Sequence, residues 1–123
     1  MPNSNEVNKV VTAQEVFDLM ATAFNKDEAL KLNKIVVVQY NVLGDGGGKW
    51  QMVLENGAYK INPGDSIPDA TCTLTYDSLE SFMGLRTGEL GAIKAFTSGK
   101  VKFAGDRKII QDVGKIFPAG KKK

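Results

Sequence analysis

The first apolar positions of the chain recur at helical spacing. They follow the segment Thr12-Ala13-Gln14-Glu15, in which Glu15 stands three residues after Thr12 and forms a capping box. The sequence therefore predicts a helix that begins after Thr12, with one or two further helical turns over residues 27–32. The apolar side of the main helix would consist of Val16, Leu19, Met20, Ala23 and Phe24.

The pattern then changes to strands. Residues 34–42 are rich in β-branched side chains and apolar on both faces, which is typical of a central strand. Residues 49–55 and 58–62 flank Asn56-Gly57, the signature of a two-residue type I′ hairpin turn. This turn places Leu54 opposite Tyr59 and sets the register of the pair. One face of the hairpin would then carry Trp50, Met52, Leu54, Tyr59 and Ile61.

A loop over residues 61–69 leads to a fourth strand, residues 70–76, in which threonines alternate with Ala70, Cys72, Leu74 and Tyr76. Asp77, with Glu80 three residues later, predicts the start of a second helix, and Gly88 its left-handed end. A short helix over residues 91–98 would bury Ile93 and Phe96.

The stretch AFTSGKVKFAGD, residues 95–106, contains a very short strand between two glycines. Gly99 ends the preceding helix, and residues 101–103 form a strand at a sheet edge, where short length and lysines protect against aggregation. Asp106 caps a last helix that Pro118 ends, with Ile109, Val113, Ile116 and Phe117 on its apolar side. The predicted class is α+β, with helices on one face of a mostly antiparallel sheet.

Composition bounds this picture to one domain. The chain has 123 residues, and we expect a flexible segment at 1–11, a domain at 12–118 and a flexible basic tail at 119–123. Its net charge of +2 includes the terminal Lys121, Lys122 and Lys123, so the body is close to neutral, which argues against binding nucleic acid. The tail would favour transient contact with an anionic membrane surface. No secretory signal is evident, and we expect a cytoplasmic protein.

The side chains that most often carry catalysis are scarce. The sequence has no histidine and one cysteine, Cys72, which alternates inward on a strand without a base partner. No acidic cluster indicates a metal site, and no cofactor is implied. The segment GDGGGK, residues 44–49, has the wrong spacing for a phosphate-binding loop and precedes a strand instead of a helix. We therefore expect a protein that is not an enzyme.

Large aromatic side chains and methionines are concentrated on the predicted helix faces and on the hairpin. Such side chains line adaptable hydrophobic sites, but they also fill ordinary cores, and composition alone favours the core. The residues in question are Phe17, Met20, Phe24, Trp50, Met52, Phe82, Met83, Phe96 and Phe117.

From Phe17 to Phe117 the chain resembles the sterol carrier protein type 2 (non-specific lipid-transfer protein) family. Four segments carry the resemblance in order and spacing: WQMVLENG, DATCTLTYD, FMGLRTGEL and AFTSGKVKFAGD. The resemblance implies a five-stranded sheet covered on one face by helices, with an apolar tunnel between them. The family pattern usually has lysine where Glu89 stands, and proline or aspartate where Gly91 stands.

Carried over to this sequence, the resemblance implies ligand-binding positions on the first helix, the sheet, the short edge strand and the three later helices. The expected ligand is a fatty acid, a fatty acyl-CoA or a sterol. These positions are Val16, Met20, Phe24, Trp50, Met52, Leu54, Leu74, Phe82, Met83, Phe96, Phe103, Ile109, Val113 and Phe117.

Two functions fit this resemblance. The first is non-enzymatic binding and transfer of lipid, and the second is an accessory domain that presents a lipid substrate to a partner enzyme of lipid metabolism. Many eukaryotic members end in a peroxisomal Ser-Lys-Leu-type signal, whereas this sequence ends in Lys121-Lys122-Lys123, so we expect no peroxisomal import.

Overall fold

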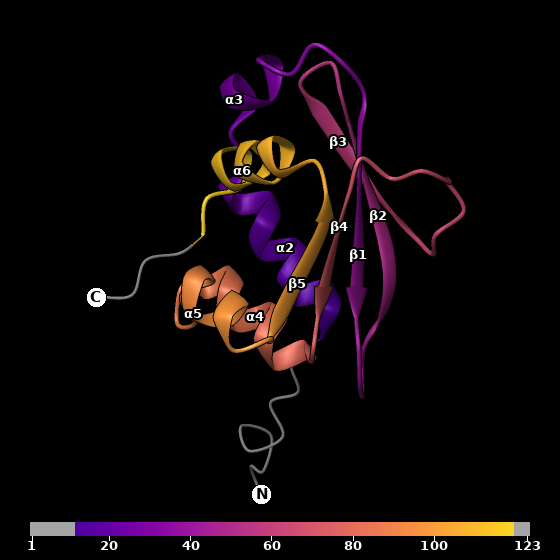
Figure 1. Cartoon of the computed structure of the whole chain (residues 1–123). Coiled ribbons are helices and arrows are strands. Elements are labelled where there is room, and N and C mark those ends of the chain that lie inside the picture. Colours follow the sequence, from indigo (N-terminus) through magenta and orange to yellow (C-terminus); the bar gives the residue numbers. More distant parts are fainter. Residues whose placement is uncertain (1–11, 120–123) are drawn as a thin grey trace, which may run out of the picture.

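The helices of the protein gather on one side of an open, twisted sheet (Figure 1), in a computed structural model that describes residues 12–119. The five strands are β1 (Val36–Val42), β2 (Gly48–Glu55), β3 (Ala58–Pro63), β4 (Cys72–Tyr76) and β5 (Val101–Gly105), in the spatial order β3-β2-β1-β4-β5. β1 and β4 are parallel, and the other neighbours are antiparallel. The predicted α+β class and mostly antiparallel sheet are confirmed.

The hairpin register follows the turn that the sequence predicted. Asn56 and Gly57 both have positive φ, 55° and 76°, as a type I′ turn requires. Leu54 pairs with Tyr59, as expected from this turn. β1 is the central strand and β5 lies at an edge, again as predicted. The expected flexible segment 1–11 and residues 120–123 of the expected tail lie outside the described residues, and the domain bounds 12–118 stay a prediction.

Five helices are described: α2 (Ala13–Ala23), α3 (Lys26–Leu30), α4 (Leu79–Thr87), α5 (Ala92–Thr97) and α6 (Arg107–Ile116). Thr12 and Glu15 form the predicted capping box, Asp106 caps α6, and Gly88 ends α4 with φ 86°. Between residues 12 and 119, no helix has the length and hydrophobicity needed to cross a bilayer.

The predicted cap of α4 is wrong by one residue. Ser78, not Asp77, is the N-cap, and its hydroxyl accepts a hydrogen bond from the Ser81 backbone N–H at 3.1 Å. The backbone N–H of Asp77 is still bonded to the carbonyl of Lys100, 2.9 Å away, beside the β4–β5 pair. Because that bond ties Asp77 to the residue just before β5, the helix begins one residue later.

The predicted burial on α5 is also wrong. Ile93 is 82% exposed and Phe96 46% exposed, whereas Ala95 is completely buried. α5 has only six residues, and Ala95 is the side chain that it buries against the rest of the protein. Its large apolar side chains are left at the surface, next to the pocket described below.

The sheet face away from the helices carries buried amides. The side-chain amide of Gln51 donates to the Gln39 side chain and to the carbonyl of Ile67, both at 2.8 Å, and the Ile67 N–H donates back to Gln51 at 3.0 Å. The loop after β3, which stands out beside the sheet in Figure 1, is thereby fixed over β1 and β2. The helices and the candidate site occupy the other face.

Candidate functional site

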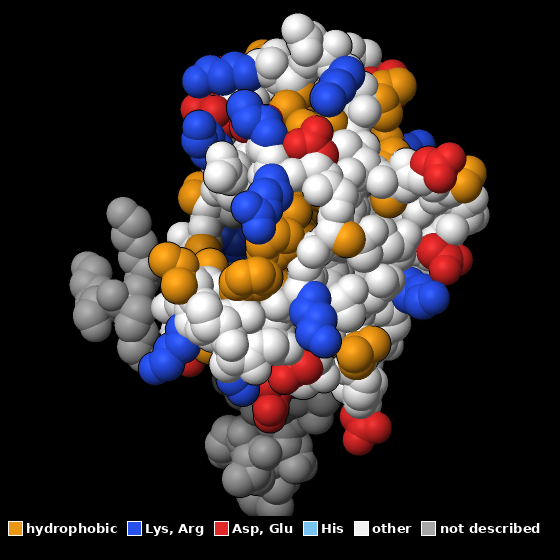
Figure 2. Space-filling view, viewed as in Figure 1, with side chains coloured by type: hydrophobic (Ala, Val, Ile, Leu, Met, Phe, Trp, Pro, Cys, Tyr) orange, Lys and Arg blue, Asp and Glu red, His pale blue; other side chains and the backbone are white. Residues whose placement is uncertain are grey.

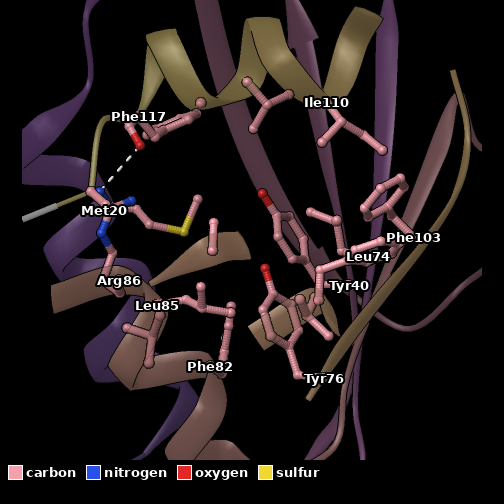
Figure 3. Close-up of a pocket in the computed structure, with 17 residues that line it drawn as sticks. Met20, Tyr40, Leu74, Tyr76, Phe82, Leu85, Arg86, Phe103, Ile110 and Phe117 are labelled. Carbon is pink, nitrogen blue, oxygen red and sulfur yellow. Dashed lines mark hydrogen bonds between the residues drawn. The ribbon is translucent and has the colours of Figure 1, made fainter. Parts of the chain in front are cut away.

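An apolar pocket of about 330 Å³ lies between the helices and the half of the sheet formed by β1, β4 and β5 (Figure 3). This volume is within the range of small-molecule sites, about 300 to 1,000 Å³. The lining comes from every helix except α3 and from the segment after α6. It consists of Val16, Met20, Tyr40, Leu74, Tyr76, Phe82, Leu85, Arg86, Ala92, Phe96, Val101, Phe103, Ile110, Val113, Gly114, Phe117 and Ala119.

Three aromatic rings form the inner wall of the pocket. The Tyr76 ring lies 4.6 Å from Phe82, and the Tyr40 ring lies 5.9 Å from Phe82 and 6.5 Å from Tyr76. Behind them, Phe17 contacts both Tyr40 and Phe82 edge-on, at 5.8 and 5.4 Å. Such contacts between rings hold the wall rigid at spacings typical of favourable aromatic pairs.

The outer side of the pocket is formed by α5, β5 and α6. The rings of Phe96 and Phe103 stack at 4.7 Å, and the Arg107 guanidinium lies 5.6 Å from the Phe103 ring. Figure 2 shows hydrophobic side chains around a recess in this part of the molecule, with basic side chains beside it. Because Phe96 is half exposed, the pocket has an apolar edge that solvent reaches.

Arg86 brings a positive charge to this lining. Its guanidinium donates to the backbone carbonyl of Phe117 at 3.1 Å and also to that of Pro118. It therefore ties α4 to the segment after α6. Burial lowers the pKa of Arg86 from its usual value, against the opposing effect of Tyr40 and Tyr76. Within the described part of the chain, no carboxylate pairs with this guanidinium.

Tyr40 and Tyr76 carry the other polar groups of the inner wall. Tyr40 is 2% exposed and Tyr76 8% exposed, and burial raises the pKa of both phenols well above the usual value. Neither hydroxyl has a hydrogen-bond partner among residues 12–119. In Figure 3 both hydroxyl oxygens point into the space between the helices and the sheet. Both phenols are therefore neutral donors at physiological pH, directed into the pocket.

With this geometry established, comparison with known proteins identifies the family. Residues 14–118 match the model of the SCP-2 sterol transfer family. The chain belongs to this family. The family resemblance expected from the four sequence motifs is thus confirmed, and the chain is called the SCP-2 domain below.

The same comparison finds relatives in which such a domain is one part of a longer protein. The SCP-2 domain is 30% identical over 104 residues to "Hydroxysteroid dehydrogenase-like protein 2" of Xenopus tropicalis, a match that covers 85% of this chain and 24% of that protein. The chain thus spans about a quarter of the length of this curated relative.

Solved structures show the same fold. The sterol carrier protein 2 of Aedes aegypti in complex with palmitate has a TM-score of 0.59 and 23% identity, with 87% of this chain and 97% of that one covered. The sec-alkylsulfatase Pisa1 of Pseudomonas sp. has a TM-score of 0.67 and 23% identity over 87% of this chain, but only 16% of the sulfatase. The fold thus occurs both as nearly a whole chain and as a small part of an enzyme.

The structure divides the sequence-predicted site residues into two groups. Those that line the pocket are Val16, Met20, Leu74, Phe82, Phe96, Phe103, Val113 and Phe117. Their contact with a ligand stays a prediction. The lining does not include Phe24, Trp50, Met52, Leu54, Met83 or Ile109.

The residues outside the lining have other contacts. Phe24 packs against Tyr59 and Phe117, at 4.8 and 5.3 Å, and is not part of the lining. Trp50 lies at a separate groove between α2 and the hairpin. Met52, Leu54 and Ile109 are buried in the core, and Met83 packs against it. The predicted pocket floor on β2 is therefore displaced toward β4 and β5.

Sequence reasoning missed about half of the lining. Tyr76 alternates with Cys72 and Leu74, so the strand pattern already placed it on the inward face, and the parallel pair puts Tyr40 beside Leu74. Arg86 had no such signal, because a basic residue before a helix-ending glycine is ordinary. The lining residues missed were Tyr40, Tyr76, Leu85, Arg86, Ala92, Val101, Ile110, Gly114 and Ala119.

The nucleophilic side chain singled out in the sequence does not face reactive partners. Cys72 is buried, and burial raises the pKa of its thiol to about 11, so the thiol is protonated at neutral pH. Over residues 12–119, no group of three or more acidic, cysteine or histidine side chains is arranged to hold a metal ion. The described site is suited to binding an apolar molecule.

Proposed function

We propose that this SCP-2 domain binds one long-chain lipid in the pocket between its helices and its sheet. The observation that carries the proposal is an apolar cavity of about 330 Å³ to which α2, α4, α5, α6 and three strands contribute. Family membership supports the same function. The palmitate complex of the Aedes aegypti protein, which shares the fold, supports an acyl chain as the ligand.

Burial of an acyl chain would supply the binding energy. A sixteen-carbon chain has about fifteen methylene groups, each contributing about 0.8 kcal/mol when it leaves water, or roughly 12 kcal/mol in all. Loss of translational and internal freedom opposes a large part of this. A dissociation constant in the micromolar range or below follows.

We further propose that the domain acts by binding and not by catalysis. The buried thiol of Cys72 and the apolar character of the lining support this. Cys72→Ser should therefore leave lipid binding nearly unchanged. An activity of the wild-type protein that is lost in Cys72→Ser would contradict the proposal.

A second role is favoured by the relatives. Because this chain matches about a quarter of a longer dehydrogenase-like protein, the domain could serve to present lipid to an enzyme of lipid metabolism. A transfer assay separates the two roles. A carrier moves a fluorescent fatty acid between two vesicle populations by itself, whereas a presenting domain binds the fatty acid without accelerating its transfer.

Exchange of lipid would take place at the edge formed by α5 and β5. Ile93 and Phe96 are exposed there, and so are Lys94 on α5, Lys100 in the turn after α5 and Lys102 on β5. Apolar side chains among lysines match the chemistry of an anionic membrane surface, at about 1 kcal/mol for each basic residue near the lipid. We propose that this edge faces the membrane during exchange.

Native mass spectrometry of the purified protein tests the central proposal most directly. A mass increase that matches a fatty acid or another lipid is the expected result, and titration with a fluorescent fatty acid should saturate. Protein without any lipid, and without a saturable signal at tens of micromolar, would refute lipid binding.

A further inference from the structure

We propose that Tyr40, Tyr76 and Arg86 form a recognition site for the carboxylate of a single-chain fatty acid. The inference rests on the proposed lipid-binding function and assigns the chemical class of the head group. It gives a role to the polar groups of a lining that is otherwise apolar.

The two phenols provide the first argument. A buried hydroxyl without a hydrogen bond costs about 1 to 3 kcal/mol, so folded proteins rarely retain one without a reason. Here Tyr40 and Tyr76, both more than nine-tenths buried, have hydroxyls without partners among residues 12–119. Figure 3 shows both oxygens directed to the same side, into the pocket. A ligand oxygen in that space would accept from both.

Arg86 provides the second argument. Two of its N–H groups are engaged by the carbonyls of Phe117 and Pro118 through a single guanidinium nitrogen, which leaves donors on the other two nitrogens. Its positive charge acts on both Tyr40 and Tyr76, lowering their pKa against the effect of burial. All three side chains line the same pocket, so the guanidinium and the phenols face the same bound ligand.

The charge balance selects a carboxylate. Among the described residues that line the pocket, Arg86 is the single charged side chain, so one negative charge would neutralise it. A half-buried cation in an apolar site is costly without a counter-ion, and a carboxylate offers two acceptor oxygens to the guanidinium and the phenols together. A neutral lipid, such as an ester, would leave the charge of Arg86 unpaired.

The arrangement also gives a direction to the hydrocarbon chain. In Figure 3, Arg86 and Phe103 lie on opposite sides of the two tyrosines. A carboxylate at Arg86 would therefore place the chain along Tyr40 and Tyr76, toward the stacked Phe96 and Phe103. The head group would lie at the half-buried end of the pocket, beside the segment 117–119.

Calorimetric titration of the whole chain with dodecanoate and with methyl dodecanoate tests the inference, because the two ligands have the same chain and differ in charge. We expect the wild-type protein to bind dodecanoate at least tenfold more tightly. Arg86→Met should abolish this preference, and Arg86→Lys should retain part of it. Tyr40→Phe with Tyr76→Phe should weaken dodecanoate binding roughly tenfold, as expected for hydrogen bonds to a charged group.

Tyr59→Phe is the matched control. Tyr59 packs against Phe24 and Phe117 and does not line the pocket, so its substitution should change neither affinity more than twofold. Thermal melting checks that each variant folds. If Arg86→Met does not fold, dodecanoate binding by the variant with Tyr40→Phe and Tyr76→Phe tests the inference. Equal wild-type affinity for both ligands, or no effect of the tyrosine substitutions, would overturn carboxylate recognition while lipid binding stands. Saturation by neither ligand would instead refute the proposed function.

Discussion

At the scale of single residues, the two sheet faces treat buried polar groups in opposite ways. The side chain of Gln51 makes hydrogen bonds to Gln39 and to the backbone of Ile67, so its polar atoms are satisfied within the protein. On the helix side, the hydroxyls of Tyr40 and Tyr76 have no such partner among the described residues. The first arrangement stabilises the fold, and the second is available to a ligand.

This contrast predicts different effects on stability. Tyr40→Phe removes a hydroxyl without a partner, so the free energy of unfolding of the lipid-free protein should stay unchanged or rise slightly. Gln51→Met breaks its hydrogen bonds and leaves the Ile67 backbone unpaired, so this free energy should fall by about 1 to 3 kcal/mol. Urea denaturation measures both. A loss on Tyr40→Phe as large as that on Gln51→Met would mean that the hydroxyl is structural.

Two glycines at the ends of the short strand β5, Gly99 just before it and Gly105 as its last residue, give a second residue-scale prediction. Gly99 and Gly105 both have positive φ, 81° and 95°. A Cβ added at Gly99 meets nothing within 4 Å, whereas one at Gly105 would lie 2.6 Å from the Thr71 carbonyl oxygen.

Gly99→Ala should therefore cost only the strain of its backbone, about 1 to 2 kcal/mol. Gly105→Ala should cost distinctly more, because the backbone of Thr71, directly before the neighbouring strand β4, would have to move. Melting temperatures of the two variants, measured side by side, test this order. Equal melting temperatures would show that the backbone near Gly105 shifts to accommodate the added methyl group at little cost.

At the scale of helices and strands, Phe17 on α2 separates two hollows. Its ring contacts Tyr40 and Phe82 of the pocket wall on one side and Trp50 of the neighbouring groove, 5.4 Å away, on the other. The groove is lined by Phe17 and Trp50 but by none of the pocket aromatics. One side chain of α2 therefore stands between the pocket wall and the groove.

Phe17→Leu should lower the free energy of unfolding modestly and deepen the pocket, because the smaller side chain leaves space behind Tyr40 and Phe82. Titration with fatty acids of increasing length should show tighter binding of longer chains than in the wild-type protein. Phe24→Leu, the same change on the same helix at a ring outside the lining, should leave this preference unaltered. An unchanged preference for chain length in Phe17→Leu would show that neighbouring side chains fill the space left by the smaller residue.

The elements also show why part of the fold could be predicted from the sequence and part of the site could not. The Asn56-Gly57 turn, the Thr12 capping box and the edge strand β5 depend on local chemistry, and all three were predicted correctly. The position of the pocket depends on how helices settle on the sheet. Thus Ile93 was expected to be buried and is exposed, and Arg86 entered the lining without a sequence signal.

At the scale of the whole molecule, the two faces of the sheet differ in what covers them. One face is closed by the loop that the amides of Gln39 and Gln51 hold, and the other carries the helices and the pocket (Figure 1). β5 forms the edge nearest the pocket, and β3 forms the opposite edge. Lipid exchange at a membrane is therefore expected at the β5 edge. Substitutions at the β3 edge serve as the control for this expectation.

Membrane encounter at this edge gives the last prediction. Ile93→Ser combined with Lys94→Glu removes an 82% exposed apolar side chain and reverses a neighbouring charge, without changing any pocket-lining residue. We expect the double variant to bind fatty acid in solution as the wild-type protein does, and to exchange it with vesicles containing phosphatidylserine several-fold more slowly. Raising the salt concentration should slow wild-type exchange in the same direction, because it screens the attraction.

The matched control is Leu30→Ser with Lys60→Glu. Leu30 is 53% exposed and lies beside Gly57 of the β2–β3 turn, and Lys60 lies on β3 at the far edge of the sheet. An exposed apolar side chain is thus removed and a lysine charge reversed away from α5. Exchange by this variant should remain close to that of the wild-type protein. If both double variants slow exchange equally, net charge and not the α5 edge determines membrane encounter. If neither slows it, the lipid enters elsewhere, and Arg86, at the half-buried end of the pocket, marks the next place to test.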